Sequence, residues 1–207
     1  MSPDVIGWIA SVVFLARLLP QPIRLARTGV PDGVSPLGAL NSAVSDIAWV
    51  LYGLAAALIP VWAVAAVALL PGIATVVLLR RRIARIDVLG AGAWLALILV
   101  AAALNSLAVV LAASVLVNQG PQVWTAIRSN RLDGISKTTW YIALADAALW
   151  GSYGVALLDV ALIGYGVVLL TSAVVILTRI WWTQRDDPIE DCDVTTDRLG
   201  VAAPVTC

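Results

Sequence analysis

The sequence predicts an all-α membrane protein with seven transmembrane helices, and three observations lead to this fold class. Of the 207 residues, 61% are hydrophobic and only 13% are charged, against roughly 25% charged residues in ordinary soluble domains. Apolar runs recur along the chain, each close to the ~20 residues that a helix needs to cross a bilayer. A three-helix segment also occurs twice. Because alternating ten-residue segments typical of a membrane barrel are absent, closed helices are the expected way to span.

The apolar runs place the helices near residues 5–26, 36–58, 61–79, 86–104, 107–127, 137–158 and 160–182. The apolar stretch from Val88 to Val117 is too long for a single span, and the polar pair Asn105-Ser106 is where we expect it to break. We expect a first repeat over 5–79, a linker transmembrane helix over 86–104, a second repeat over 107–182, and a disordered acidic cytoplasmic tail over 183–207.

Positive charge predicts the orientation of the chain. Twelve of the thirteen basic residues follow the first, third, fifth and seventh predicted helices. The positive-inside rule makes all twelve cytoplasmic if the N-terminus is outside and the C-terminus is cytoplasmic. We therefore expect a multi-pass protein of the cell (cytoplasmic) membrane. One lysine against twelve arginines points to a bacterial source.

A shift of 101 positions, without a gap, aligns the two halves of the sequence. Both copies carry their basic loop after the first helix, which predicts parallel repeats with a linker helix between them. Substrate sites of such repeats lie near the midplane at the repeat interface. The aligned pairs are Pro20-Gln21 with Pro121-Gln122, Asp32-Gly33 with Asp133-Gly134, Trp49 with Trp150, and Tyr52-Gly53 with Tyr153-Gly154.

The doubled Pro-Gln, each followed by a basic loop containing Asp, Gly and Ser, resembles the PQ-loop repeat. The three-plus-one-plus-three layout over about residues 5–182 resembles the SWEET-like (MtN3/saliva) and PQ-loop membrane transporters. This resemblance implies a facilitator or proton-coupled carrier of sugars, amino acids or related small solutes. Sugar-binding members carry an asparagine midway along the third helix of each unit. Neither predicted helix 61–79 nor 160–182 contains one, so an amino-acid-like solute is as well supported as a sugar.

We expect hinges at Pro20, Gln21, Pro121 and Gln122, because proline within a helix lacks an N–H and clashes with the preceding turn. A kink that only shapes the bundle is the alternative, since membrane helices tolerate proline. Trp49 and Trp150 lie near the middle of their helices, away from the headgroups where tryptophan usually anchors. By resemblance they stack on the substrate; plain packing is the alternative.

Polar groups inside predicted helices complete the candidate substrate-binding set. Asp46 and Asp146 precede Trp49 and Trp150 by three and four residues, so each carboxylate shares a helix face with a tryptophan. An aspartate exposed to lipid is costly, so both should face the bundle interior. We expect one to pair with Arg17 while the other exchanges protons or binds a cationic group; structural hydrogen bonding is the alternative. Arg17 aligns with Asn118 and either snorkels or faces the cavity.

Other functions are less well matched by the sequence. There is no histidine, and the only cysteines are Cys192 and Cys207 in the tail, so we expect neither a metal nor another cofactor. Balanced charge gives no reason to expect a nucleic acid. An aspartyl intramembrane protease would need sequence contexts that are absent, so we expect no enzyme. A non-transporting binding or sorting receptor remains an alternative. The expected partners are a small-molecule solute and membrane lipid, with oligomeric state, including a homo-oligomer, left open.

Overall fold

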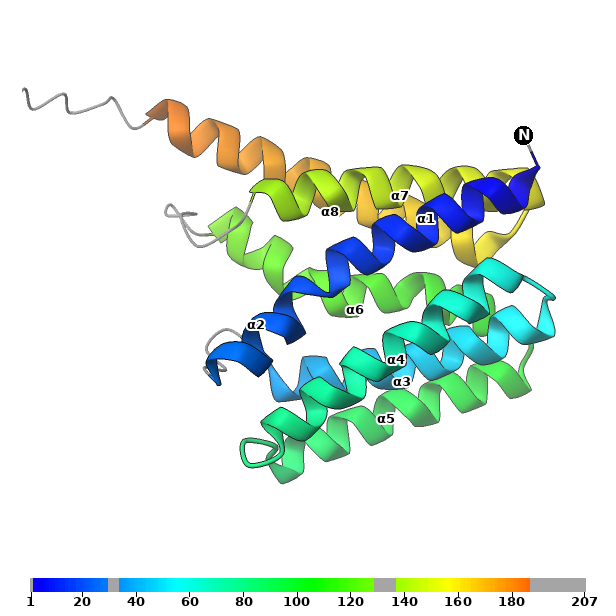
Figure 1. The fold of residues 1–207 in the computed structure, drawn as a ribbon, viewed down its shortest axis with the longest axis horizontal. Helices are drawn as coiled ribbons and strands as arrows, with labels where there is room; N and C mark the ends of the chain where they lie inside the picture. The colour runs from blue at the N-terminus through cyan, green and yellow to red at the C-terminus, as the bar shows by residue number, and fades with distance from the viewer. Residues whose placement is uncertain (1, 30–33, 129–136, 187–207) are drawn as a thin grey trace, which may run out of the picture.

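The computed structural model describes residues 2–29, 34–128 and 137–186. Within these ranges the chain is helical and contains no strand (Figure 1). The helices are α1 (Pro3–Leu18), α2 (Pro20–Thr28), α3 (Pro36–Ala55), α4 (Ile59–Leu79), α5 (Arg85–Ala103), α6 (Leu107–Arg128), α7 (Lys137–Leu157) and α8 (Val160–Asp186). The predicted tail from residue 187 onward lies outside the described residues.

The first predicted helix is divided in two, whereas its counterpart in the second half is not. Pro20 is the first residue of α2, and Leu19 before it keeps helical backbone angles (φ −66°, ψ −32°). A proline fits the first turn of a helix because its missing N–H has no partner there anyway. Pro121 lies within α6, which is assigned as one helix. The predicted break at Asn105-Ser106 is confirmed, because α5 ends at Ala103 and α6 begins at Leu107.

Five helices of the described chain are long and apolar enough to cross a membrane. They comprise α1 with α2, and α3, α4, α5 and α8, while α6 contributes a shorter apolar helix, Leu107–Asn118. These lengths and compositions identify a helical, membrane-embedded protein. Large apolar side chains such as Leu70 (70% exposed) and Leu89 (68% exposed) lie on the outside of the bundle, as expected where lipid replaces water.

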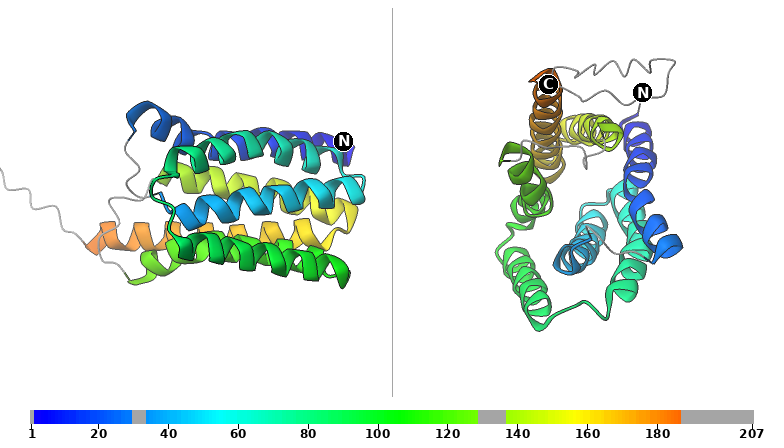
Figure 2. Two further views of the ribbon diagram at one scale, coloured as in Figure 1. Left: turned by 90° about the horizontal axis from the view of Figure 1, so that it is seen from below. Right: turned by 90° about the vertical axis from the view of Figure 1, so that its left-hand side faces the viewer.

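The helix contacts follow the same pattern in both halves of the chain. α4 packs against α1 and α3, and α8 packs against α6 and α7. The two groups meet where α1 contacts α7 and where α3 contacts α6, and α5 packs against both α3 and α6. Figure 2 shows the helices side by side along a common direction, with their ends gathered at two faces. One face carries the arginines that end α2, α4 and α6, and the other carries the short turns.

The repeated Tyr-Gly pair has a packing explanation. A Cβ added to Gly53 would lie 2.7 Å from the backbone nitrogen of Trp62, and one added to Gly154 would lie 2.7 Å from that of Ile163. Only glycine therefore lets α3 approach α4, and α7 approach α8, this closely. The two contacts stand at the same offset in each half of the chain.

The turns α3–α4, α5–α6 and α7–α8 share one backbone design. Ala57, Asn105 and Leu158 adopt left-handed angles, with φ of 56°, 53° and 54°. Each turn is closed by a six-residue backbone hydrogen bond: Leu58 N to Gly53 O (2.8 Å), Ser106 N to Ala101 O (2.8 Å) and Asp159 N to Gly154 O (2.9 Å). These are Schellman motifs built without glycine at the left-handed position. They hold consecutive helices close together at the turn face of the bundle.

Candidate solute-binding cavity

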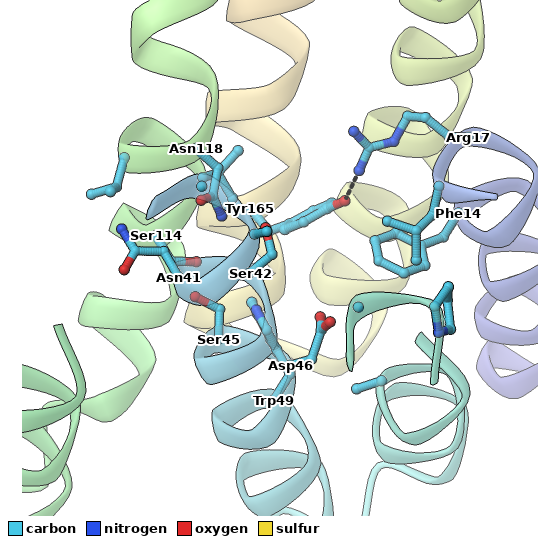
Figure 3. Close-up of a pocket in the computed structure, with 18 of the residues that line it drawn as sticks. Phe14, Arg17, Asn41, Ser42, Ser45, Asp46, Trp49, Ser114, Asn118 and Tyr165 are labelled. Carbon is cyan, nitrogen blue, oxygen red and sulfur yellow. Dashed lines mark hydrogen bonds between the residues drawn. The ribbon is translucent and has the colours of Figure 1, made fainter. Parts of the chain in front are cut away.

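A cavity of about 650 Å³ lies between the two helix groups and is lined by residues of α1, α3, α4, α6, α7 and α8 (Figure 3). Its lining begins at Ser35 and Thr139, which are exposed near the starts of α3 and α7. It extends to Trp49 and Trp150, about two thirds of the way along the same helices. The cavity thus runs from the arginine face past the middle of the bundle, and its volume suits a small molecule.

The structure brings most of the predicted site residues to this cavity. Five of the six predicted substrate-binding residues line it: Arg17, Asp46, Trp49, Asn118 and Trp150. Asp146 lies behind the surface and is 0% exposed. Of the predicted hinge residues, Pro20 and Gln21 begin α2, and Pro121 and Gln122 lie within α6.

An ion pair closed by a tyrosine forms one wall of the cavity, which we call the charged wall (Arg17, Asp146 and Tyr165). Arg17 Nε lies 3.0 Å from Asp146 Oδ2. The Tyr165 hydroxyl donates a hydrogen bond to the same oxygen (2.9 Å) and accepts one from Arg17 Nη2 (3.0 Å). Arg17 therefore pairs with Asp146 rather than with Asp46, and the bonds join α1, α7 and α8. A carboxylate so buried is compensated only by partners of this kind.

Tyr165 escaped the sequence-based prediction, although a signal for it exists. It is the only aromatic residue in the apolar run from Val160 to Thr178. A hydroxyl in the middle of such a run has to find a partner among neighbouring helices. Its partners lie on helices whose pairing cannot be deduced from spacing along the chain.

Small polar side chains on α3 and α6 form the opposite side, here called the neutral wall (Asn41, Ser42, Ser45, Ser114 and Asn118). Ser45 Oγ accepts a hydrogen bond from Trp94 Nε1 of α5 (2.9 Å), and Ser114 Oγ donates one to the Leu111 carbonyl (2.6 Å). Asn41 is 9% exposed, and its Oδ1 finds no hydrogen-bond partner among the described residues. Apart from Asn118, these residues were not predicted, although positions 38, 41, 42, 45 and 49 fall on one helical face.

Asp46 differs from Asp146 in having no polar partner. It is half-buried and lines the cavity, and the described residues provide no hydrogen bond or salt bridge to its carboxylate. In Figure 3 the Asp46 carboxylate and the Tyr165 ring both border the open part of the cavity. A Cβ added to Gly72 of α4 would stand 3.6 Å from Asp46 Oδ2, so this glycine leaves room beside the carboxylate.

Aromatic rings close the inner end of the cavity. The Trp49 ring meets the rings of Tyr52 and Tyr165 edge-on, with centroids 5.9 and 6.0 Å apart. Trp150 lies 5.9 Å from Tyr153 in a similar edge contact. Such edge-to-face geometry is favourable between aromatic rings. The two tryptophans therefore form a packed floor, of which Trp49 remains the more accessible and Trp150 is 4% exposed.

Two hydrogen bonds between the halves lie beyond this floor, at the turn face. The Tyr52 hydroxyl donates to Asp159 Oδ2 (2.7 Å), and the Tyr153 hydroxyl donates to Asp4 Oδ1 (3.4 Å). The first bond joins α3 to the residue before α8, and the second joins α7 to α1. Both span the boundary between the helix groups, so the bundle is closed here while the cavity reaches the arginine face.

Within the described ranges, no three His, Cys, Asp or Glu side chains gather into a group that could hold a metal ion. Comparison with known proteins found no family model that matches the chain and no curated protein that matches it.

Proposed function

We propose that this protein is a seven-helix membrane transporter that moves a small polar solute by alternating access between two parallel three-helix repeats joined by α5. The observation that carries the proposal is a cavity between two groups of helices with matching contacts, whose lining includes polar and charged side chains deep inside the bundle. Polar and ionisable groups inside a membrane bundle mark solute pathways by default. Parallel repeats place such sites at their interface, in agreement with the PQ-loop and SWEET-like resemblance.

Seven spans require α6 and α7 to cross the membrane in addition to the five apolar helices. The composition of α7 is compatible with this role, because its polar Asp146 is fully buried while Tyr141 and Val155 are about 60% exposed (61% and 60%). The arginine distribution then places the N-terminus outside and the C-terminus in the cytoplasm. Single cysteines at Ala84 and Asn105, in a chain whose native Cys192 and Cys207 are replaced by serine, should label from opposite sides. Labelling from the same side would contradict this topology.

Alternating access needs one end of the pathway to open as the other closes. The cavity reaches the arginine face, so the structure corresponds to a state open toward the cytoplasm in the proposed orientation. Opening the other end requires the bonds of Tyr52 and Tyr153 to Asp159 and Asp4 to break. The division between α1 and α2 at Pro20 provides a point at which the mouth can close, and Pro121 is the corresponding position in α6.

Solute flux into proteoliposomes tests this function. The double variant Trp49→Ala/Trp150→Ala removes the cavity floor and should abolish uptake of a transported sugar or amino acid, while the protein stays in the membrane. Trp8→Ala is the matched control, because Trp8 is 48% exposed on the outside of α1, and it should transport normally. Full transport by the double variant would contradict the site. Solute binding without flux in the wild type would instead favour the alternative, a non-transporting binding or sorting receptor.

A further inference from the structure

The unpaired carboxylate of Asp46 restricts the kind of solute that fits the cavity, and the following inference rests on the proposed function. Among the described residues that line the cavity, Arg17 and Asp46 are the charged ones. Arg17 is already engaged by the fully buried Asp146 at 3.0 Å, so these two charges cancel. When it is ionised, Asp46 contributes a negative charge that no described residue of the charged wall or the neutral wall compensates. A charge held away from water needs a partner, and a cationic group of the solute would supply it.

The groups beside Asp46 are also those that bind a cation. An ammonium group offers three N–H donors to the Asp46 carboxylate. Trp49 lies one turn beyond Asp46 on the same face of α3. The centroids of the Trp49 and Tyr165 rings are 6.0 Å apart. Aromatic faces attract cations, most strongly where water is excluded. The Asp46 carboxylate and the rings of Trp49 and Tyr165 therefore lie in one part of the cavity.

We propose that the solute carries a protonated amine without a compensating carboxylate, and that the amine binds beside Asp46, Trp49 and Tyr165. A zwitterion fits less well, because its carboxylate would compete with Asp146 for Arg17. A neutral solute would leave the Asp46 carboxylate unpaired. The amine site thus selects small organic monocations over neutral or zwitterionic compounds of the same size.

Three four-carbon probes of matched length test this selectivity on the purified full-length protein: 4-aminobutan-1-ol, butane-1,4-diol and 4-aminobutanoate. Their affinities follow from ligand-induced shifts of the melting temperature, since binding raises stability by mass action. We expect the amino alcohol to bind at least about tenfold more tightly than the diol, equivalent to about 1.4 kcal/mol, and more tightly than the zwitterion. Equal responses to the amino alcohol and the diol, including none to either, would overturn the proposal. Tighter binding of the zwitterion would also overturn it.

Asp46→Asn identifies the residue responsible, because it removes the charge with almost no change in shape. This variant should bind the amino alcohol and the diol about equally. Asp87→Asn is the matched control: it removes the same charge from the start of α5, where the Asp87 side chain accepts a hydrogen bond from Ala84 N (2.8 Å), and it should keep the wild-type preference. An unchanged preference in Asp46→Asn would contradict the amine site.

Flux measurements keep this inference distinct from the proposed function. Amine-selective binding that depends on Asp46, together with no flux of any probe, would retain the amine site and contradict the transporter. Flux of butane-1,4-diol at equal rates in wild type and Asp46→Asn, with no preference for the amino alcohol, would retain the transporter and contradict the amine site.

Discussion

Two residues of the charged wall and two of the neutral wall occupy equivalent positions in the sequence and carry different chemistry. A shift of 101 residues relates Arg17 to Asn118, Asp146 to Ser45 and Tyr165 to Val64. The charged wall holds a buried ion pair bridged by a hydroxyl, whereas the neutral wall holds uncharged polar groups and a hydrogen bond from Trp94. Meanwhile Trp49, Tyr52 and Gly53 have identical counterparts. The matching positions maintain the helix packing, and the differing ones give the cavity two unlike surfaces.

The largest expected effect comes from breaking the charged wall. Arg17→Met leaves the buried Asp146 carboxylate unpaired, and losing one partner of a buried pair costs about 3–5 kcal/mol. We expect the free energy of unfolding in detergent micelles, measured by SDS titration, to fall by that amount. Asn118→Met, the same change at the equivalent exposed position, should change it by less than about 0.5 kcal/mol. The double variant Arg17→Met/Asp146→Leu should recover most of the loss, and failure to recover would contradict the ion-pair interpretation.

The bridging hydrogen bonds sharpen the same comparison. Tyr165→Phe removes a hydroxyl that contacts two charged groups, and such bonds are worth about 1.5–3 kcal/mol. Ser45→Ala removes a neutral acceptor on the other wall and should cost about 1 kcal/mol. Both losses are measured by the same SDS titration. A larger loss for Ser45→Ala than for Tyr165→Phe would mean that charge does not distinguish the walls energetically.

The glycine contacts test whether the helix packing of the two halves is as alike as their walls are different. Gly53→Ala and Gly154→Ala each force a Cβ against the backbone of the next helix, and overpacking of this kind costs about 1–3 kcal/mol. The two losses should be similar. Gly92→Ala is the control, because a Cβ there meets nothing within 4 Å, and alanine should stabilise α5 by about 0.5–1 kcal/mol. A loss at only one of the two sites would show that the halves pack differently.

The smallest effect is expected at the turn face. Tyr52→Phe removes a hydrogen bond of 2.7 Å and should cost about 0.5–1.5 kcal/mol, while Tyr153→Phe removes a longer one of 3.4 Å and should cost less. If these bonds hold the closed end of the pathway, removing either one should let an impermeant thiol reagent enter from the turn face. A cysteine placed at Ser42 should then react faster with that reagent than it does when both bonds are intact. Tyr52→Phe should accelerate labelling more than Tyr153→Phe does, and unchanged rates in both would argue against a closing role.

The lengths of the hydrophobic runs predicted where the helices lie, because run length depends on local sequence. Even the break at Asn105 followed from the excess length of one apolar stretch. The sequence could not predict that the helix is divided at Pro20 but continuous at Pro121, because proline occupies both positions. Spacing along α3 predicted that Asp46 and Trp49 share a helix face, and both residues line the cavity.

The choice between Asp46 and Asp146 as the partner of Arg17 was beyond the sequence. It depends on α1 packing against α7 instead of α3, which is a long-range contact. Tyr165 and the serines of the neutral wall were missed for a related reason. The partners of Tyr165 lie on α1 and α7, and that of Ser45 lies on α5, and spacing along one helix does not give these contacts.

The three Schellman turns bear on how the chain enters a membrane during synthesis. Tight closure makes helical hairpins of α3 with α4, α5 with α6, and α7 with α8. In the proposed seven-span topology each hairpin would insert as a unit with its backbone already hydrogen-bonded. The first helix of the second half would then arrive with α5, ahead of α7 and α8. The α5–α6 hairpin would then combine the linker helix with the first helix of the second half, so the inserting hairpins would not coincide with the two halves. In addition to connecting the halves, α5 would insert together with α6.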